Sequence, residues 1–182
     1  MMNSFNSPNQ QTGVALFISL VLLLVLTIIG VSSVQTTSLE VRMTRNQHDS
    51  TLAFQSAESA LRDAEAQVEA LVSTAGFTDT GNNGLYNVAD FGDEEHWHAA
   101  AAWTGANSVV AGTVVDGIAE QPRYLVEHVA SVLLEDNAYQ LDDPYAAAAA
   151  DRVEMFRITA RGVGGTINAR VLLQSSYGRI LD

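Results

Sequence analysis

Residues 14–34 read VALFISLVLLLVLTIIGVSSV, a stretch of 21 residues that contains neither a charged residue nor a proline. About 20 apolar residues, each rising ~1.5 Å along an α-helix, span the hydrocarbon core of a bilayer. The hydroxyl groups of Ser19, Thr27, Ser32 and Ser33 are compatible with insertion because they can bond back to helix carbonyls. The stretch therefore predicts a membrane-spanning helix over residues 14–34.

A cleaved secretory signal is the alternative interpretation of this stretch. Such a signal has a basic leading region, an apolar run of about 7–15 residues and a small-x-small cleavage site. Residues 1–13, MMNSFNSPNQQTG, contain no basic residue, and the apolar run that follows is longer than a signal requires. A retained membrane helix fits the sequence better.

All the formal charge of the chain lies after this stretch. The 182 residues include 21 acidic and 9 basic residues, all nine of them arginine, and the first charged residue is Glu40. A net charge of −12 argues against a nucleic-acid partner, because such a protein repels phosphate. The absence of cysteine excludes disulfide scaffolds, cysteine-based zinc sites and thiol catalysis. Residues 40–182 are enough for one modest domain with a single core.

Helical periodicity continues beyond the apolar run. Apolar residues recur at spacings of 3, 4, 3, 4 and 3, at Phe54, Ala57, Leu61, Ala64, Val68 and Leu71. Neither glycine nor proline occurs between Val31 and Thr74, and Gly76 is a plausible stop signal. We expect one continuous helix from about residue 14 to about residue 72, ~90 Å long. A single-span anchor followed by a separate juxtamembrane helix remains the alternative.

The remainder predicts a small sheet. Residues 109–115, 124–134, 153–161 and 166–176 are expected strands, and Gly162–Gly165 is the expected turn of a hairpin between the last two. Residues 74–108 are expected to be loop-like, with a short helix in DEEHWHAAAAW, and residues 135–151 form an acidic excursion. The predicted fold class is α+β, with the long helix laid across the apolar face of a three- or four-stranded antiparallel sheet.

No residue pattern indicates an enzyme or a cofactor site. The histidines His48, His96, His98 and His128 lack the spacing of a zinc motif. The acidic residues Asp136, Asp142, Asp143 and Asp151 carry calcium-type ligands but not the calcium-loop pattern, so a solvated acidic loop is the simpler interpretation. Gly162–Gly165 lacks the following Lys-Ser/Thr of a phosphate-binding loop. We therefore expect no enzyme activity, no cofactor and no metal.

Two parts of the sequence resemble a known family. Gly13 followed by VALFISLVLLLVLTIIG resembles the processing site and helix of type IV pilin-like proteins. TTSLEVRMTRNQHDSTLAFQSAESALRDAE resembles the N-terminal region of PilX-family minor pilins, and PRYLVEHV and FRITARGVGGTINARVLLQSSYGR resemble strands of that family's C-terminal domain. The resemblance covers about residues 12–70 and two stretches of the remainder.

The resemblance implies a pilin-like fold and a role in pilus assembly. A prepilin peptidase would cut after Gly13, and the new N-terminal residue Val14 would be methylated. The implied segments are a leader (1–13), a transmembrane half of the helix (14–34), an amphipathic half (35–73) and a periplasmic α+β domain (74–182). The chain would sit in the inner membrane and later in the pilus at the cell surface, helping to prime assembly at or near the tip and supporting twitching motility and adhesion. Its implied partners are inner-membrane lipid, the peptidase, other minor pilins, the major pilin and a tip adhesin.

Two positions depart from the usual pilin pattern. Most pilins carry Glu at the fifth position of the mature chain, whereas this chain has Ile18. A carboxylate in apolar surroundings is costly unless it pairs with an opposite charge, such as the N-terminal amine of a neighbouring subunit. A subunit without this carboxylate needs no neighbour above it. This suits a position at the tip, as in the similar GspK-type pseudopilins. The leader also lacks basic residues, while Arg42 and Arg45 follow the apolar run, so the positive-inside rule points weakly toward a domain inside the cell.

Two other functions compete with a PilX-like minor pilin. A GspK-like pseudopilin of type II secretion belongs to the same class of machinery, although that subunit carries a large inserted domain. A single-span periplasmic sensor or ligand-binding protein belongs to a different class and needs no cut at Gly13. It would instead be expected to carry an output domain before the membrane helix.

Overall fold

The computed structural model describes residues 12–133 and 152–181. The chain divides into two compact units, Met1–Arg45 and Asn46–Asp182. Helix α1 (Thr12–Glu69) begins in the first unit and ends in the second. The expected acidic excursion, residues 135–151, lies outside the described residues.

The second unit is built on a mixed sheet. Its three long strands are β3 (Arg123–Leu133), β4 (Arg152–Val163) and β5 (Arg170–Ile180), each antiparallel to the next. Two short strands, β1 (Leu85–Asn87) and β2 (Val109–Val110), both pair with β3, β1 in parallel and β2 antiparallel. The α+β fold class is confirmed. The expected sheet is entirely antiparallel, whereas β1 pairs in parallel with β3. The reason is that β1 and β3 are joined by a long connection and not by a hairpin.

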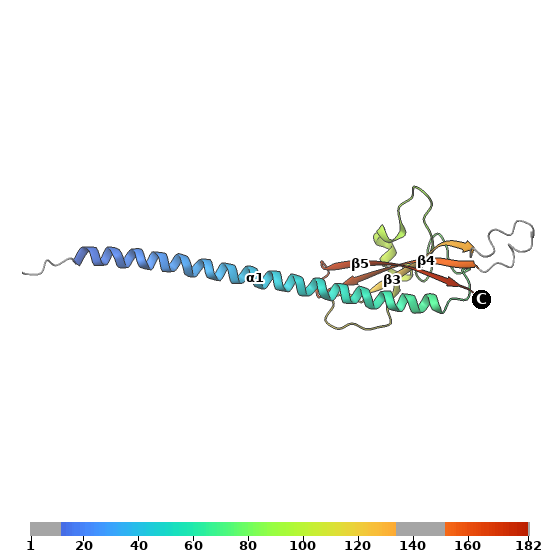
Figure 1. The fold of residues 1–182 in the computed structure, drawn as a ribbon, viewed down its shortest axis with the longest axis horizontal. Coiled ribbons are helices and arrows are strands. Elements are labelled where there is room, and N and C mark those ends of the chain that lie inside the picture. Colours follow the sequence, from blue (N-terminus) through green and yellow to red (C-terminus); the bar gives the residue numbers. More distant parts are fainter. Residues whose placement is uncertain (1–11, 134–151, 182) are drawn as a thin grey trace, which may run out of the picture. The chain divides into compact units, whose positions relative to one another are not determined.

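Residues 46–69 of α1 cover one face of this sheet (Figure 1). Alternate residues of the strands supply the sheet side of the core, with Tyr124, Val126, Phe156, Ile158 and Ala160 all buried. The helix side consists of the buried residues Ala53, Ala57, Ala60, Ala64 and Val68. Of the predicted stripe, Ala57, Ala64 and Val68 are fully buried and Leu61 and Leu71 are partly buried against the core, whereas Phe54 is half exposed. The helix buries Ala53 and Ala60 in addition, which the stripe did not include.

Close backbone approach explains why small residues line this part of the helix. A Cβ atom added at Gly162 would overlap the backbone of Ala53 and Ala57, and would lie 2.8 Å from the Ala57 Cβ. A Cβ at Gly164 would likewise overlap the Asp49 carbonyl oxygen. Gly162 is thus a residue of strand β4 against the helix and not part of the turn, which the sequence placed at Gly162–Gly165.

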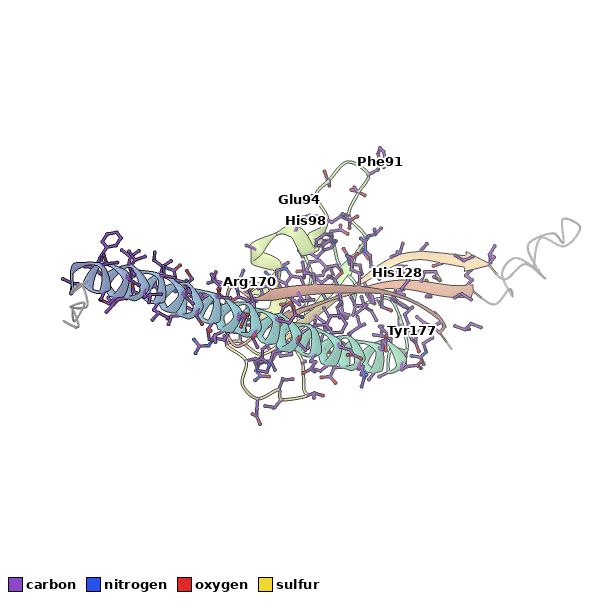
Figure 2. All side chains as sticks on the ribbon, turned by 60° about the vertical axis from the view of Figure 1, so that its left-hand side comes forward. Phe91, Glu94, His98, His128, Arg170 and Tyr177 are labelled. Carbon is purple, nitrogen blue, oxygen red and sulfur yellow. The ribbon has the colours of Figure 1, made fainter. Side chains whose placement is uncertain are left out.

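The opposite face of the sheet is partly covered by a second layer. Three 3-10 turns, η1 (His96–His98), η2 (Ala100–Trp103) and η3 (Gly105–Asn107), replace the short helix expected in this region. Trp103 and Ala102 pack on Leu125 and Tyr86, with Trp97 beside them, to form a second small core. Phe91 lies at the exposed tip of the loop that precedes these turns (Figure 2).

Candidate functional site: the apolar half of helix α1

The first unit contains, in its described part, the start of helix α1, whose surface is predominantly apolar on all sides over residues 14–34. Residues 13–45 are exposed throughout. Among the exposed large side chains are Leu16, Phe17, Leu20, Leu23, Leu26, Ile29 and Val34. The mean hydropathy of the most apolar 18-residue window is 3.1, and none of that window is buried. By length and composition this helix can cross a membrane, which agrees with the sequence prediction.

Two hydroxyl side chains of residues 14–34 bond to the helix itself. The hydroxyl of Ser19 donates to the Leu16 carbonyl at 2.8 Å, and the hydroxyl of Thr27 donates to the Leu24 carbonyl at 2.7 Å. Because these groups satisfy their hydrogen bonds locally, they do not need water or a polar neighbour. The surface of the segment therefore suits lipid or the apolar faces of other helices.

The three residues singled out from the sequence lie in the first two turns of α1. A Cβ added at Gly13 would meet no atom within 4 Å, so the backbone at this position is open on the side of the missing side chain. Val14 and Ile18 are 57% and 52% exposed, respectively. All three lie at one end of the apolar surface, next to residues 1–11, which the structure does not describe.

An ion-pair cluster ties the second unit together. Glu127 on β3 is fully buried and accepts a hydrogen bond from Arg157 Nε at 2.7 Å. Arg157 also pairs with Glu95, which precedes η1. Burial lowers the pKa of Arg157, but the carboxylates of Glu127 and Glu95 raise this pKa more, so that it lies above its usual value. The cluster joins the outer layer to strands β3 and β4.

Polar contacts also fix the helix on the sheet. Arg179 on β5 donates to the carbonyl oxygens of Val68 at 2.8 Å and Leu71 at 2.9 Å, and also to that of Glu69. These carbonyls lie at the C-terminal end of α1, where intrahelical partners run out, so Arg179 caps the helix. Near the start of the part of α1 that packs on the sheet, the Asp49 carboxylate accepts hydrogen bonds from the Thr166 backbone N–H, at 3.1 Å, and from the Thr166 hydroxyl. The Thr166 hydroxyl bond is the main cause that lowers the pKa of Asp49.

Three of the four histidines contact other side chains or the backbone of the second unit. His96 lies 3.0 Å from the Asn87 carbonyl oxygen and stacks on Tyr86, and His98 stacks on Trp97. His128 Nε2 lies 2.6 Å from a Glu154 carboxylate oxygen. His48 is exposed on the helix.

No group of three or more metal-ligating side chains occurs within residues 12–133 and 152–181. Asp136, Asp142, Asp143 and Asp151, the acidic residues that we interpret as a solvated loop, lie outside the described residues.

Several residues that organise the domain were not singled out from the sequence. Arg157, Arg179 and Asp49 act over long sequence separations, so no local motif marks them. The sequence alone predicts that Gly162 is a turn residue, because Gly164 and Gly165 follow it closely. The only local signal for its packing role is the run of alanines at helical spacing that faces it.

A long N-terminal helix, apolar at its start and packed at its end on an antiparallel-rich sheet, defines an α+β pilin-like fold. Two family descriptions match the sequence: PilX N-terminal over residues 12–62, and type IV pilus assembly protein PilX C-term over residues 45–179. The chain therefore belongs to the PilX family of type IV pilus assembly proteins, and is a structural pilus component. No curated protein and no solved structure gives a significant match.

Proposed function

We propose that this chain is a minor pilin that enters the pilus through the apolar half of helix α1 and helps to prime filament assembly. The observation that carries the proposal is the uncharged apolar surface of residues 14–34, which no described residue of the chain covers. Such a surface is stable only in lipid or against other apolar helices. A filament core of packed pilin helices supplies the second environment after the membrane supplies the first.

Processing at the start of the helix belongs to the same proposal. A prepilin peptidase cuts after Gly13, and Val14 becomes the methylated N-terminal residue. Support comes from the sequence at this point, where a glycine directly precedes the apolar run, and from the family match that begins at residue 12. The domain is then periplasmic while the helix is in the inner membrane, and reaches the cell surface with the pilus.

A single-cysteine experiment tests entry into the filament. The chain contains no cysteine, so Leu24→Cys on the apolar helix and Phe91→Cys on an exposed loop are clean reporters. In sheared filaments, a water-soluble maleimide should label F91C and leave L24C unlabelled, because neighbouring helices cover Leu24. Absence of the chain from sheared filaments, or equal labelling of the two variants, overturns the proposal.

The position within the filament is proposed from Ile18. A carboxylate at this place would need a partner in the apolar core, and its absence removes the need for a subunit above. We therefore place the chain at or near the tip, where it supports adhesion and twitching motility and contacts a tip adhesin. The test is Ile18→Glu with immunogold labelling of the subunit, with Ile18→Leu as the matched control. If I18E subunits stay confined to the tip and assembly is unchanged, the missing carboxylate does not set the position.

A further inference from the structure

Two arginines follow the apolar run of helix α1, with no acidic residue between them. Arg42 and Arg45 are three residues apart, so they lie on the same side of the helix. Val34 and Ser38 line that side with them, whereas Glu40, two residues before Arg42, does not. The two arginines are the first basic residues of a chain whose net charge is −12. The region after the apolar run therefore has a positive side on an acidic protein.

Neither arginine is neutralised within the part of the chain that the structure describes. Both residues are exposed, and neither forms an ion pair with a described carboxylate. The arginines that do form such pairs are Arg62, Arg157, Arg161 and Arg179. The guanidinium groups of Arg42 and Arg45 are thus accessible to an anion that comes from outside the chain.

The distance from the apolar run places Arg42 at the level of the lipid headgroups. Residues 14–34 form a helix ~31 Å long, which matches a hydrocarbon core of ~30 Å. Arg42 lies ~12 Å beyond Val34 along the helix. Because side chains on a helix lean back over the preceding turn, by ~5 Å, the Arg42 guanidinium lies ~7 Å outside the hydrocarbon. A headgroup layer is ~5–8 Å thick, so Arg42 reaches the phosphates, and Arg45 lies about one turn further out.

Phosphodiester groups are the anions that a bilayer presents at this level. Guanidinium groups bind phosphate oxygens through paired N–H donors, and the stems of long basic side chains can stay against apolar surface while their heads reach the headgroups. Anionic lipids are favoured over zwitterionic ones, because no cationic group on the same lipid competes for the phosphate. A basic residue near an anionic lipid surface corresponds to about a fivefold preference.

We propose that Arg42 and Arg45 bind the phosphate groups of anionic phospholipids at the membrane surface where the apolar run ends. The contact requires that the helix spans the bilayer, and so rests on that part of the proposed function. It gives the two arginines a role other than orienting the chain, which is the only role that the positive-inside rule considers.

The experiment uses the full chain in phosphatidylcholine vesicles. The chain has no cysteine, so Val34→Cys places a single bimane fluorophore at the edge of the hydrocarbon, on the side of Arg42 and Arg45. A small, equal fraction of the lipid carries a nitroxide near the headgroup end of an acyl chain, either as phosphatidylglycerol or as phosphatidylcholine. A nitroxide lipid that contacts the fluorophore quenches its fluorescence, so the ratio of the two quenching values measures which headgroup gathers at this side of the helix. Labelled phosphatidylglycerol should quench about twice as strongly as labelled phosphatidylcholine.

Variants of the same single-cysteine chain assign the preference to the two arginines. Arg42→Gln should lower the quenching ratio more than Arg45→Gln, because Arg42 lies at the level of the phosphates. The double variant R42Q/R45Q should remove the preference, since glutamine keeps a high helix propensity but carries no charge. Arg62→Gln removes an exposed positive charge elsewhere on α1, so it is the matched control and should keep the wild-type ratio.

The outcomes distinguish the headgroup contact from the proposed function. Quenching by neither lipid would show that the helix does not enter the bilayer, and would overturn both. Equal quenching by the two lipids in the wild type, or an undiminished preference in R42Q/R45Q, would overturn the headgroup contact alone.

Discussion

The substitution Arg157→Met tests whether the buried ion pair organises the sheet domain. Glu127 is fully buried, and its Oε2 accepts from Arg157 Nε at 2.7 Å, while Oε1 has no hydrogen-bond partner among the described residues. R157M would leave this carboxylate buried without its counter-charge. Removing one partner of a buried pair costs about 3–5 kcal/mol. Because the Arg157 side chain is 24% exposed, we expect the lower end of that range, about 3 kcal/mol.

The expected change in thermal stability follows from the size of the chain. About 3 kcal/mol corresponds to a fall in Tm of about 6–12 °C for a protein of this length. The assay is thermal unfolding of the full chain in detergent micelles, followed by tryptophan fluorescence. Trp97 and Trp103 both belong to the second unit, so the signal reports that unit alone.

Two further variants decide the cause. Arg62→Met removes an exposed i,i+4 pair with Glu58 and should cost no more than about 1 kcal/mol. Glu127→Met combined with R157M should regain most of the lost stability, because an apolar pair replaces a buried ionic one at little cost. Equal Tm values for R157M and R62M, or a double variant less stable than R157M, would refute the reasoning.

Three other substitutions or conditions probe the contact between helix and sheet. Gly162→Ala should lower the free energy of unfolding by about 1–3 kcal/mol in denaturant titrations, since the new methyl group meets the helix backbone. An unchanged denaturation midpoint would contradict the close approach of strand β4 to the backbone of α1. Arg179→Gln should lower the free energy of unfolding of the domain by about 1–3 kcal/mol, because three carbonyl oxygens lose their donor. It should also speed amide hydrogen exchange in the last turn of α1. An unchanged exchange rate would show that water caps the helix equally well. Because the pKa of Asp49 is lowered in the folded chain, its carboxylate stabilises the fold at pH values above the ordinary aspartate pKa, and this stabilisation is lost as the pH falls through the lowered pKa. The free energy of unfolding should therefore decline less on acidification in D49N than in the wild type. Identical pH profiles of stability would show that Asp49 is not a cause of the decline.

Much of the fold was accessible from local patterns in the sequence. The structure contains the elements that three local patterns predict. These patterns are the long uncharged apolar run, the apolar residues at helical spacings of 3 and 4, and the strands in which apolar and polar residues alternate. The predicted strand 124–134 is β3 within one residue at each end, and the last two predicted strands are β4 and β5 with shifted ends. The turn between them begins later than predicted, because glycines read as turn residues serve a helix contact.

The parts that were not predicted depend on contacts between distant residues. Strand β1 has three residues and follows a turn with positive φ at Asn83 and Gly84, so it carries too little periodicity to be recognised. The strand expected at 109–115 is reduced to Val109–Val110, since the chain leaves the sheet to bond with Asp63 through Thr113. The contact of the Arg161 guanidinium with the Trp103 ring joins β4 to η2, and no spacing in the sequence indicates that these elements meet.

The central claim is that the apolar helix begins as a processed pilin N-terminus and ends in a filament. The most direct measurement is the N-terminal residue and its mass, determined by mass spectrometry for the chain in purified membranes and in sheared surface filaments. In the filaments, the chain should start at Val14, with a methyl group on its amino nitrogen. An intact Met1 found only in the membranes would contradict it.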